Sequence, residues 1–178
     1  MKTFSRLSIA AVLLITACTS PEVKQELAKE DYTNKIDSLE KKLHQAQIID
    51  NSTGVDMIAA YTSYAEHFPE DTITPDYLFK AGEIASSVKQ GQRAINIYNS
   101  ICEKYPSYKK IHYCLFLQAF IYETQLNNLE KAKEIYNKVI EKYPNESISN
   151  DAKACIQNLG KSDEELIKEF ESKNKKSS

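Results

Sequence analysis

The stretch AINIYNSICEKYP at residues 94–106 returns as AKEIYNKVIEKYP at residues 132–144. The two copies share an alanine, a tyrosine, an aliphatic residue and a closing Tyr-Pro, all in the same register and without a gap. A third ending of this kind, Phe68-Pro69, lies at nearly the same spacing before Tyr105-Pro106. Periods of this length are typical of helical-hairpin repeats, in which each unit buries its apolar side against its neighbours. The recurrence predicts an all-α superhelix of stacked helical hairpins.

The composition agrees with a helical chain. Only 4 of the 178 residues are glycine and 5 are proline, and tryptophan is absent. The 11 tyrosines can seal contacts between helices while their hydroxyls stay near water. The formal net charge is -2, which does not favour nucleic acid as a partner, because nucleic-acid binders concentrate positive charge.

The first residues have the order of a secretion signal. Lys2 and Arg6 supply the positive start, and residues 7–15 form an apolar core that is short for a membrane span. The sequence LITAC then ends at Cys18. Small residues between such an apolar run and a cysteine resemble the lipobox of bacterial lipoproteins. The resemblance predicts a cleaved lipoprotein signal peptide over residues 1–17; the alternative is an ordinary signal peptide followed by a chance cysteine.

The lipobox resemblance implies diacylation of Cys18, cleavage before it and, in many bacteria, an amide-linked acyl chain. Several acyl chains would anchor the protein stably, with residues 18–21 as a lipidated linker. Thr19 is not the acidic residue that signals inner-membrane retention in enterobacteria, which favours the outer membrane. Glu22 is only a weak version of the acidic cluster that sends some Bacteroidota lipoproteins to the surface, so the periplasmic face is favoured.

Residues 22–50 contain no glycine and predict one N-terminal helix. Its apolar residues form an a/d seam of about two heptads, fewer than a convincing coiled coil needs. The seam consists of Tyr32, Ile36, Leu39, Leu43 and Ala46. This segment forms a short coiled coil that makes the protein an oligomer, or lies on the repeats as a single amphipathic helix, or stands as a solvated stalk.

Helical segments with apolar stripes fill the rest of the chain, so residues 53–172 are predicted to form the repeat domain. The expected helices cover about residues 53–68, 75–90, 93–104, 110–125, 129–143, 147–159 and 163–172. The last helix has one apolar edge and a polar outer face, as the end of a repeat stack requires. Residues 173–178 are expected to be a disordered tail.

Turn and cap residues mark the expected boundaries. Residues 53–56, TGVD, fit a capping box, and Thr74-Pro75 fits a capped helix start. Gly91 lies where a left-handed helix cap is often needed. The asparagines at 127–128 predict a turn, and SDEE at residues 162–165 is a second capping box.

The repeats resemble tetratricopeptide repeats over about residues 55–159. The positions of the family pattern hold Leu78, Ala81, Gly82, Ala94, Tyr98, Ile101 and Pro106 in the first copy, and Phe116, Ala119, Ala132, Tyr136, Val139 and Pro144 in the second. The small residues allow the helices of a hairpin to cross closely. The second copy departs at Phe120, where the family prefers glycine or alanine, which predicts looser or shifted packing there. The spacing of 38 exceeds the family's usual length of about 34.

Longer repeats with Tyr-Pro endings are similar to those of envelope proteins of the BamD and YbgF (Tol-Pal-associated) types. The lipidated cysteine resembles the former, and the helix before the repeats resembles the latter. The stretches 119–126 and 158–162 are similar to small Bacteroidota lipoproteins. Tetratricopeptide repeats bind extended peptides or helices in a groove lined by the first helix of each hairpin, so the resemblance implies an envelope protein or peptide segment as partner.

The inner face of the first helices is the candidate partner groove. It would include Phe79, Glu83, Ser86, Ser87, Leu117, Ile121, Thr124 and Gln125. Leu117 and Ile121 can alternatively be core residues, and in so short an array the C-terminal helices can fill much of the groove.

No residue set points to catalysis. His44, His67 and His112 lie in different expected helices, and no HExxH, CxxC, nucleophile elbow or glycine-rich phosphate loop occurs. The acidic residues 163–165 are best interpreted as the solvated first turn of a helix, where the dipole favours negative charge. The sequence therefore predicts no enzyme, no cofactor and no metal site.

Three cysteines follow Cys18. Cys102 lies one turn before the end of an expected helix and Cys114 about one turn into the next, so antiparallel packing could bring them close. One alternative is a Cys102–Cys114 disulfide, and the other is three small buried thiols, Cys155 included.

The function that follows is a non-catalytic, lipid-anchored scaffold at the outer membrane. Cys18 would hold it at the membrane, residues 22–50 would space the repeats, and the repeats would dock a partner during envelope assembly or maintenance. An alternative is a surface-exposed lipoprotein that binds a glycan or nutrient as accessory to an uptake system. A third is an accessory subunit of an enzyme.

Overall fold

The computed structural model describes residues 21–45 and 50–176, so the expected signal peptide and Cys18 lie outside the described residues. This part of the chain contains helices and no strand, which confirms the all-α fold class. The helices are α1 (Pro21–Gln45), α2 (Asn51–His67), α3 (Thr74–Ser87), α4 (Gly91–Lys104), α5 (Ile111–Thr124), α6 (Leu129–Lys142), α7 (Ser147–Asn158) and α8 (Asp163–Lys176). None of them is long and apolar enough to cross a membrane.

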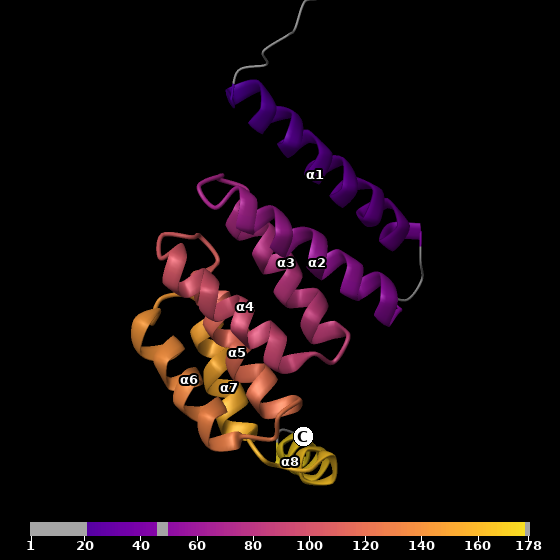
Figure 1. Cartoon of the computed structure of the whole chain (residues 1–178). Helices are drawn as coiled ribbons and strands as arrows, with labels where there is room; N and C mark the ends of the chain where they lie inside the picture. Colours follow the sequence, from indigo (N-terminus) through magenta and orange to yellow (C-terminus); the bar gives the residue numbers. More distant parts are fainter. Residues whose placement is uncertain (1–20, 46–49, 177–178) are drawn as a thin grey trace, which may run out of the picture.

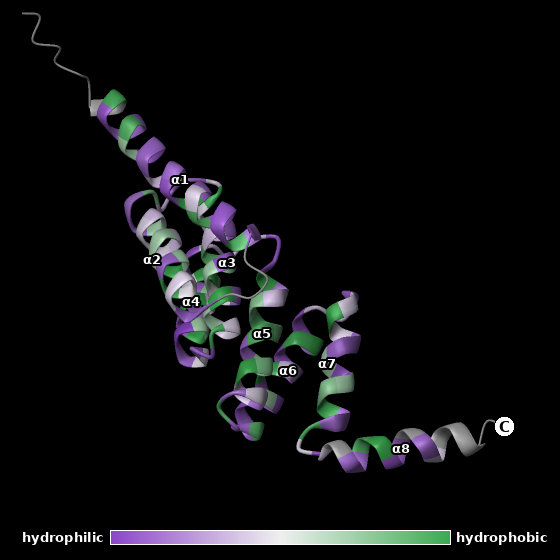
Figure 2. Cartoon of the chain, turned by 90° about the vertical axis from the view of Figure 1, so that its right-hand side faces the viewer, coloured by the Kyte–Doolittle hydropathy of each residue, from purple (hydrophilic) through white to green (hydrophobic). Residues whose placement is uncertain are grey.

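Helices α2 to α7 form one stack in which each helix packs on the one before it (Figure 1). One hydrophobic cluster joins α1 to α5, and a second joins α5 to α7. Helix α5 belongs to both, since Cys114 and Ile121 are buried in the first cluster and Ala119 in the second. Helix α8 extends away from the stack, so it does not cover the first helices (Figure 2).

Three helices end with the same backbone geometry. Phe68, Tyr105 and Tyr143 follow α2, α4 and α6 with φ between -131° and -128° and ψ between 51° and 60°. Each precedes a proline, whose ring pushes the preceding residue out of the helical region. At two of these endings a hydroxyl group of the following helix donates a hydrogen bond to the last carbonyl. Thr74 Oγ1 donates to the Phe68 carbonyl at 2.6 Å, and Ser149 Oγ donates to the Tyr143 carbonyl at 2.5 Å. The ending at Phe68 is therefore equivalent to the two later ones.

The two full hairpins, α3–α4 and α5–α6, differ by one residue in the length of the loop that joins their two helices. The first helices, α3 and α5, begin at Thr74 and Ile111, an offset of 37, whereas the second helices, α4 and α6, begin at Gly91 and Leu129, an offset of 38. The additional residue lies in the α5–α6 loop, where Asn127 has a φ of 49°.

The shorter offset of the first helices changes which residue sits at the close crossing in α5. Ala119, not Phe120, occupies the place of Gly82, and it is fully buried. Of the two expectations at Phe120, looser or shifted packing, the structure shows the shift: the Phe120 side chain lies outside the helix crossing and is 42% exposed.

Two expected helix starts are shifted. Helix α2 begins at Asn51, because the Asp50 carboxylate accepts a hydrogen bond from the Thr53 N–H at 2.9 Å and so serves as the cap that the capping box was expected to supply. Thr74 does not cap α3, because its hydroxyl is engaged by the preceding turn and Ile73 is the N-cap residue.

Gly91 opens α4 instead of ending α3. The left-handed residue in that loop is Lys89, with a φ of 61°. A Cβ at position 91 would lie 2.9 Å from Cγ2 of Ile121, so glycine serves here to let α4 approach α5 closely.

Three further predicted turns and caps agree with the structure. Gly160 has a φ of 78° just after α7, and the Asn128 side chain caps α6 by accepting from the Lys131 N–H at 3.0 Å. Ser162 and Glu165 form the reciprocal hydrogen bonds of a capping box. Helix α8 continues to Lys176, so part of the tail that was expected to be disordered is helical. The cap at its N-terminal end and the lysines at its C-terminal end favour this longer helix.

The apolar seam of α1 packs inside the chain. Ile36 is 1% exposed, and Tyr32, Leu39 and Leu43 pack against the same cluster as α2. Ala46 lies outside the described residues. Of the three alternatives, the structure shows the amphipathic helix that lies on the repeats. A coiled coil through this seam would require α1 to leave α2.

Polar contacts hold α1 to α2, to α3 and to the loop between them. Glu40 accepts a hydrogen bond from the Tyr61 hydroxyl at 2.5 Å and pairs with Lys80 of α3 at 2.7 Å. Nearer the start of α1, Lys29 pairs with Asp71 in the loop after α2. The helix next to the expected membrane anchor is thereby fixed to the repeats and is not a free stalk.

Acidification should weaken the docking of α1. Burial opposes ionisation, but hydrogen bonds from Lys80 and Tyr61 hold the pKa of Glu40 below its ordinary 4.5. Because the folded-state pKa is the lower one, Glu40 stabilises the fold fully above about pH 4.5 and loses this effect as the pH falls through the folded-state pKa. Urea unfolding should show wild type more stable than Glu40→Gln by about 1 kcal/mol at pH 6, and this difference should shrink as the pH falls below about 4.5. A difference that does not change with pH would contradict this role of Glu40.

Candidate partner-binding face

Helices α3 and α5 turn equivalent rows of side chains away from the core. Asp76, Lys80, Glu83 and Ser87 of α3 correspond to Tyr113, Leu117, Phe120 and Thr124 of α5 at the offset of 37. Asp76 and Leu117 are half-buried and the other six are exposed. We call these eight residues the first-helix face.

The α5 row of this face is apolar over most of its length. Tyr113 and Phe120 are 40% and 42% exposed, and Leu117 lies half-buried between them. Helix α5 is mainly hydrophobic along its length, as the green of its ribbon in Figure 2 shows. A helix in the middle of the stack buries its flanks against the helices before and after it, so its third apolar side is left to solvent. Adjacent exposed apolar residues of this kind mark interaction sites.

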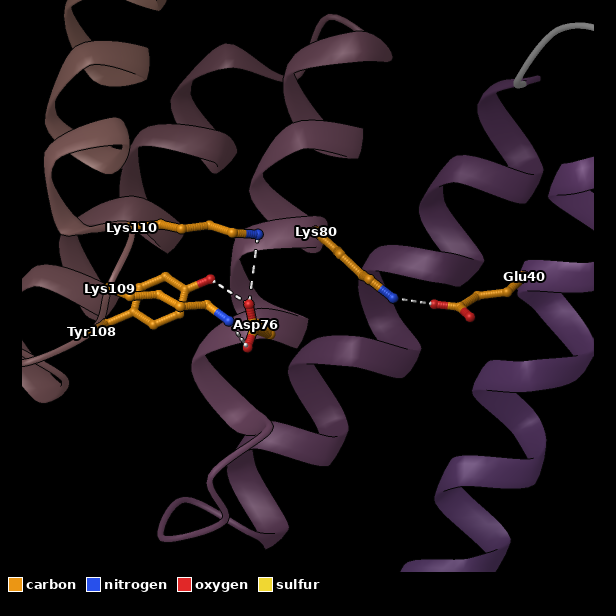
Figure 3. A network of polar contacts seen from close by, with 6 residues as sticks. All are labelled: Glu40, Asp76, Lys80, Tyr108, Lys109 and Lys110. Atoms are coloured by element: carbon orange, nitrogen blue, oxygen red, sulfur yellow. Dashed lines mark hydrogen bonds and ion pairs between the residues drawn. The ribbon is translucent and has the colours of Figure 1, made fainter. Parts of the chain in front are cut away.

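The α3 row is mostly charged, and contacts from α1 and from the α4–α5 loop hold two of its charges in place (Figure 3). Lys80 is paired with the α1 carboxylate described above. Asp76 accepts a hydrogen bond from the Tyr108 hydroxyl at 2.7 Å and lies 3.7 Å and 3.6 Å from the ammonium groups of Lys109 and Lys110. Burial opposes ionisation, but these three partners hold the pKa of Asp76 below its ordinary value. The carboxylate of Asp76 is therefore charged and well ordered.

Glu83 differs from its charged neighbours in α3. Although its side chain reaches solvent, the surrounding atoms desolvate it and raise the pKa of its carboxyl group, and Lys110 and Lys80 offset only part of that shift. Lys110 instead lies over the ring of Phe79, 4.6 Å from its centre. A bound partner that offers a positive charge or a hydrogen-bond donor would satisfy this carboxyl group.

Gln125 joins the C-terminal ends of α3 and α5. Its side-chain amide donates to the carbonyl of Ser86 at 3.0 Å and to the hydroxyl at 2.9 Å. The structure thus brings together two expected groove residues, Ser86 and Gln125, and they form hydrogen bonds with each other. Ser87 and Thr124 lie exposed at the same ends of these helices.

Two expected groove residues belong to the core instead. Phe79 is 6% exposed and packs against the rings of Tyr98 and Tyr108, and Ile121 is 1% exposed. The remaining expected residues are Glu83, Ser87 and Thr124, which are exposed, and Leu117, which is half-buried.

The first-helix face includes residues that the repeat period alone does not single out. The repeat period of 38 relates Glu83 to Ile121, whereas the helices themselves are offset by 37, and one residue turns a side chain by about 100° around a helix. Phe120 therefore takes the place that the sequence assigned to Ile121. One feature of the sequence could have revealed this exposed position of Phe120: an aromatic residue stands where the repeat pattern prefers glycine or alanine.

Open depressions lie along the turns at one end of the helices. One of about 520 Å³ is bordered by residues 104–109 and the start of α3, and another of about 420 Å³ lies between α1 and residues 67–71. The repeat pattern did not point to either. Both are lined by mixed charges, and their side chains do not converge on a single ligand type.

His67 and His112 have packing and hydrogen-bonding roles. A ring nitrogen of His67 lies 3.0 Å from the Tyr32 hydroxyl, and His112 packs against the rings of Tyr113 and Tyr143. Residues 21–45 and 50–176 contain no group of three His, Cys, Asp or Glu that could hold a metal ion.

Comparison with known proteins found one family model that matches part of the chain. Residues 113–146, which cover most of α5 and all of α6, match the model of the tetratricopeptide repeat. A search of curated proteins found no match. The chain therefore contains a tetratricopeptide repeat, and proteins with such repeats generally bind protein partners and are generally not catalysts. The match, together with the all-helical stack, supports a helical-repeat scaffold of the kind that mediates protein–protein interaction.

Proposed function

We propose that this protein is a non-catalytic scaffold, anchored by lipid on Cys18 at the periplasmic face of the outer membrane, whose first-helix face docks an envelope protein during assembly or maintenance of the envelope. The observation that carries the docking part is the exposed apolar row on α5, with Tyr113 and Phe120 at 40% and 42% exposure. The lipobox-like sequence before Cys18 supports the anchoring part.

The face favours a partner segment with apolar and basic side chains. Large aromatic anchors such as Tyr113 and Phe120 contribute most to interfaces when a partner excludes water from them. Glu83 lies in the neighbouring α3 row with a carboxyl group that lacks an ion pair among the described residues. An amphipathic helix or extended segment would lay its apolar residues on α5 and direct a lysine or arginine toward α3.

The position of α1 supports a short link between membrane and repeats. Helix α1 begins at Pro21, three residues after Cys18, and it is fixed to α2 and α3 by the contacts of Lys29 and Glu40. The first-helix face would therefore stand at a set distance from an anchor at Cys18, and docking would position the partner close to the bilayer surface.

Photo-crosslinking in living cells tests this proposal. A photoreactive amino acid at position 120 should crosslink to one envelope protein, whereas the same group at Val55, which is 38% exposed on α2, should not. Purified wild-type protein should bind that partner at least about tenfold more tightly than Phe120→Glu, with Val55→Glu as the matched control. Equal crosslinking from both positions, or unchanged affinity of Phe120→Glu, would contradict docking on the first-helix face.

The anchor and its location need their own measurements. Cys18→Ala should move the protein from the membrane fraction to the soluble fraction, and added protease should spare the anchored form on intact cells. Membrane association that survives the substitution would contradict anchoring through Cys18. Degradation on intact cells would contradict the periplasmic face and would favour the surface-exposed binder of glycan or nutrient.

A further inference from the structure

Cys102 and Cys114 lie together at the junction between the two full hairpins. Cys102 is in the last turn of α4, Cys114 is in the first turn of α5, and the loop over residues 105–110 reverses the chain between them. Both are free thiols in the cluster that joins α1 to α5. Cys114 is fully buried whereas Cys102 is half-buried, so a reagent in solution reaches Cys102 first.

Two side chains act on the sulfur of Cys102. The buried amide of Gln118 donates a hydrogen bond to it from 3.9 Å, and the side chain of Cys114 interacts with it across the α4–α5 junction. The interaction with Cys114 is the main cause that lowers the pKa of Cys102, with burial opposing it and Gln118 adding to it. The same pairing and burial raise the pKa of Cys114. Cys102 is thus the thiol that ionises first and the better nucleophile.

We propose that Cys102 and Cys114 form a reversible disulfide site that joins α4 to α5 and is oxidised by exchange with a small-molecule disulfide such as oxidised glutathione. Cys102 as thiolate attacks one sulfur of the oxidant, whose S–S bond breaks and releases one glutathione thiolate. Cys114 then gives up its proton and attacks the Cys102 sulfur, which releases the second glutathione. Two protein thiols lose two electrons and two protons in total, and the oxidant becomes two molecules of reduced glutathione.

The bond would connect the two hairpins at the start of the helix that carries the apolar row. Cys114 directly follows Tyr113, a member of the first-helix face. A covalent link at this point would fix the orientation of α5 relative to α4 and so restrain the α5 row. The inference rests on the cysteines and Gln118 alone and does not depend on the proposed function.

Cys155 provides an internal control. It lies in α7 and packs against the second hydrophobic cluster. The Cys102–Cys114 site lies in the other cluster, so Cys155 should stay a thiol when that site is oxidised.

Thiol counting tests the pairing. The full chain carrying Cys18→Ser is equilibrated with oxidised glutathione, unfolded in urea and titrated with a thiol reagent. The three thiols of the reduced chain should fall to one, and mass mapping should link the peptides of Cys102 and Cys114. The same chain with Cys155→Ala should give the same linked peptides and no thiol. A link to Cys155, or three thiols after equilibration, would overturn the proposal.

The order of reaction and the native geometry have separate readouts. In Cys114→Ser, which keeps a hydroxyl donor beside Cys102, glutathione should add to Cys102 about tenfold faster than it adds to Cys114 in Cys102→Ser. The oxidised chain should melt about 5 °C higher than the reduced chain and return to the lower value after treatment with dithiothreitol. Equal adduct rates would overturn the role of Cys102 as nucleophile. A lower melting temperature after oxidation would show that the sulfurs are not placed to bond in the native fold.

Discussion

Tyr136→Ala is expected to lower the free energy of unfolding by about 3–5 kcal/mol. Tyr136 is fully buried in the cluster that joins α5, α6 and α7, and its ring centre lies 5.4 Å from that of Phe116. Removing the ring loses this burial and leaves a cavity that the surrounding helices fill only in part. Because the cluster holds three helices, urea unfolding followed by helical circular dichroism should show the whole C-terminal half becoming less stable.

Two conservative variants separate the ring of Tyr136 from its hydroxyl. The hydroxyl donates to Glu123 at 2.8 Å, so Tyr136→Phe should cost about 1–2 kcal/mol. Tyr98 occupies the equivalent place in α4, but its buried hydroxyl has no hydrogen-bond partner in the described part of the chain. Tyr98→Phe should therefore leave stability unchanged or raise it slightly. Equal losses in the two phenylalanine variants would contradict this difference between the repeats.

Gly82→Ala should destabilise the protein by about 1–3 kcal/mol, although alanine is the better helix former by about 1 kcal/mol. A Cβ at position 82 would lie 2.6 Å from Cε1 and 2.7 Å from Cζ of Tyr98. Tyr98 is fully buried, so its ring cannot swing aside without displacing the surrounding core. The substitution should appear as a lower urea midpoint without a change in the slope of the transition.

A double-mutant cycle identifies the cause of the Gly82 effect. In a Tyr98→Leu background the crowding ring is gone, so Gly82→Ala should be neutral or stabilising. Ala119→Gly, the reverse exchange at the matching position of α5, should cost about 1 kcal/mol through lost helix propensity. If Gly82→Ala costs the same with and without the tyrosine ring, close approach to Tyr98 is not what requires glycine there.

The candidate site was only partly predictable, and the reason lies in one loop residue. The repeat period read from the two Tyr-Pro endings leads from Glu83 to Ile121, whereas the structure pairs Glu83 with Phe120. The longer loop at Asn127 restores the full period for α6 and hides the shorter offset of α5. Along the chain the two hairpins look identical in length, so only the packed helices reveal which side of α5 faces solvent.

The N-terminal helix shows a second limit of the same kind. The spacing of Tyr32, Ile36 and Leu39 predicts that one side of the helix is buried, and that much follows from periodicity. Periodicity does not identify the surface that covers this side, because an a/d seam fits the same helix of a second protein molecule as well as it fits α2. The contacts of Glu40 with Tyr61 and Lys80 involve residues far along the chain, and they decide in favour of α2.

The sequence by itself determined that this chain is an all-α stack of hairpins, that the hairpins end at aromatic-proline pairs, and which residues form the close helix crossings, Phe120 apart. These features depend on local spacing and on the backbone restriction that proline imposes. The tertiary structure decided that α5 leaves an apolar row exposed beside the charged row of α3. That result depends on the rotation of each helix about its own axis within the stack. Long-range packing sets this rotation, and local spacing does not.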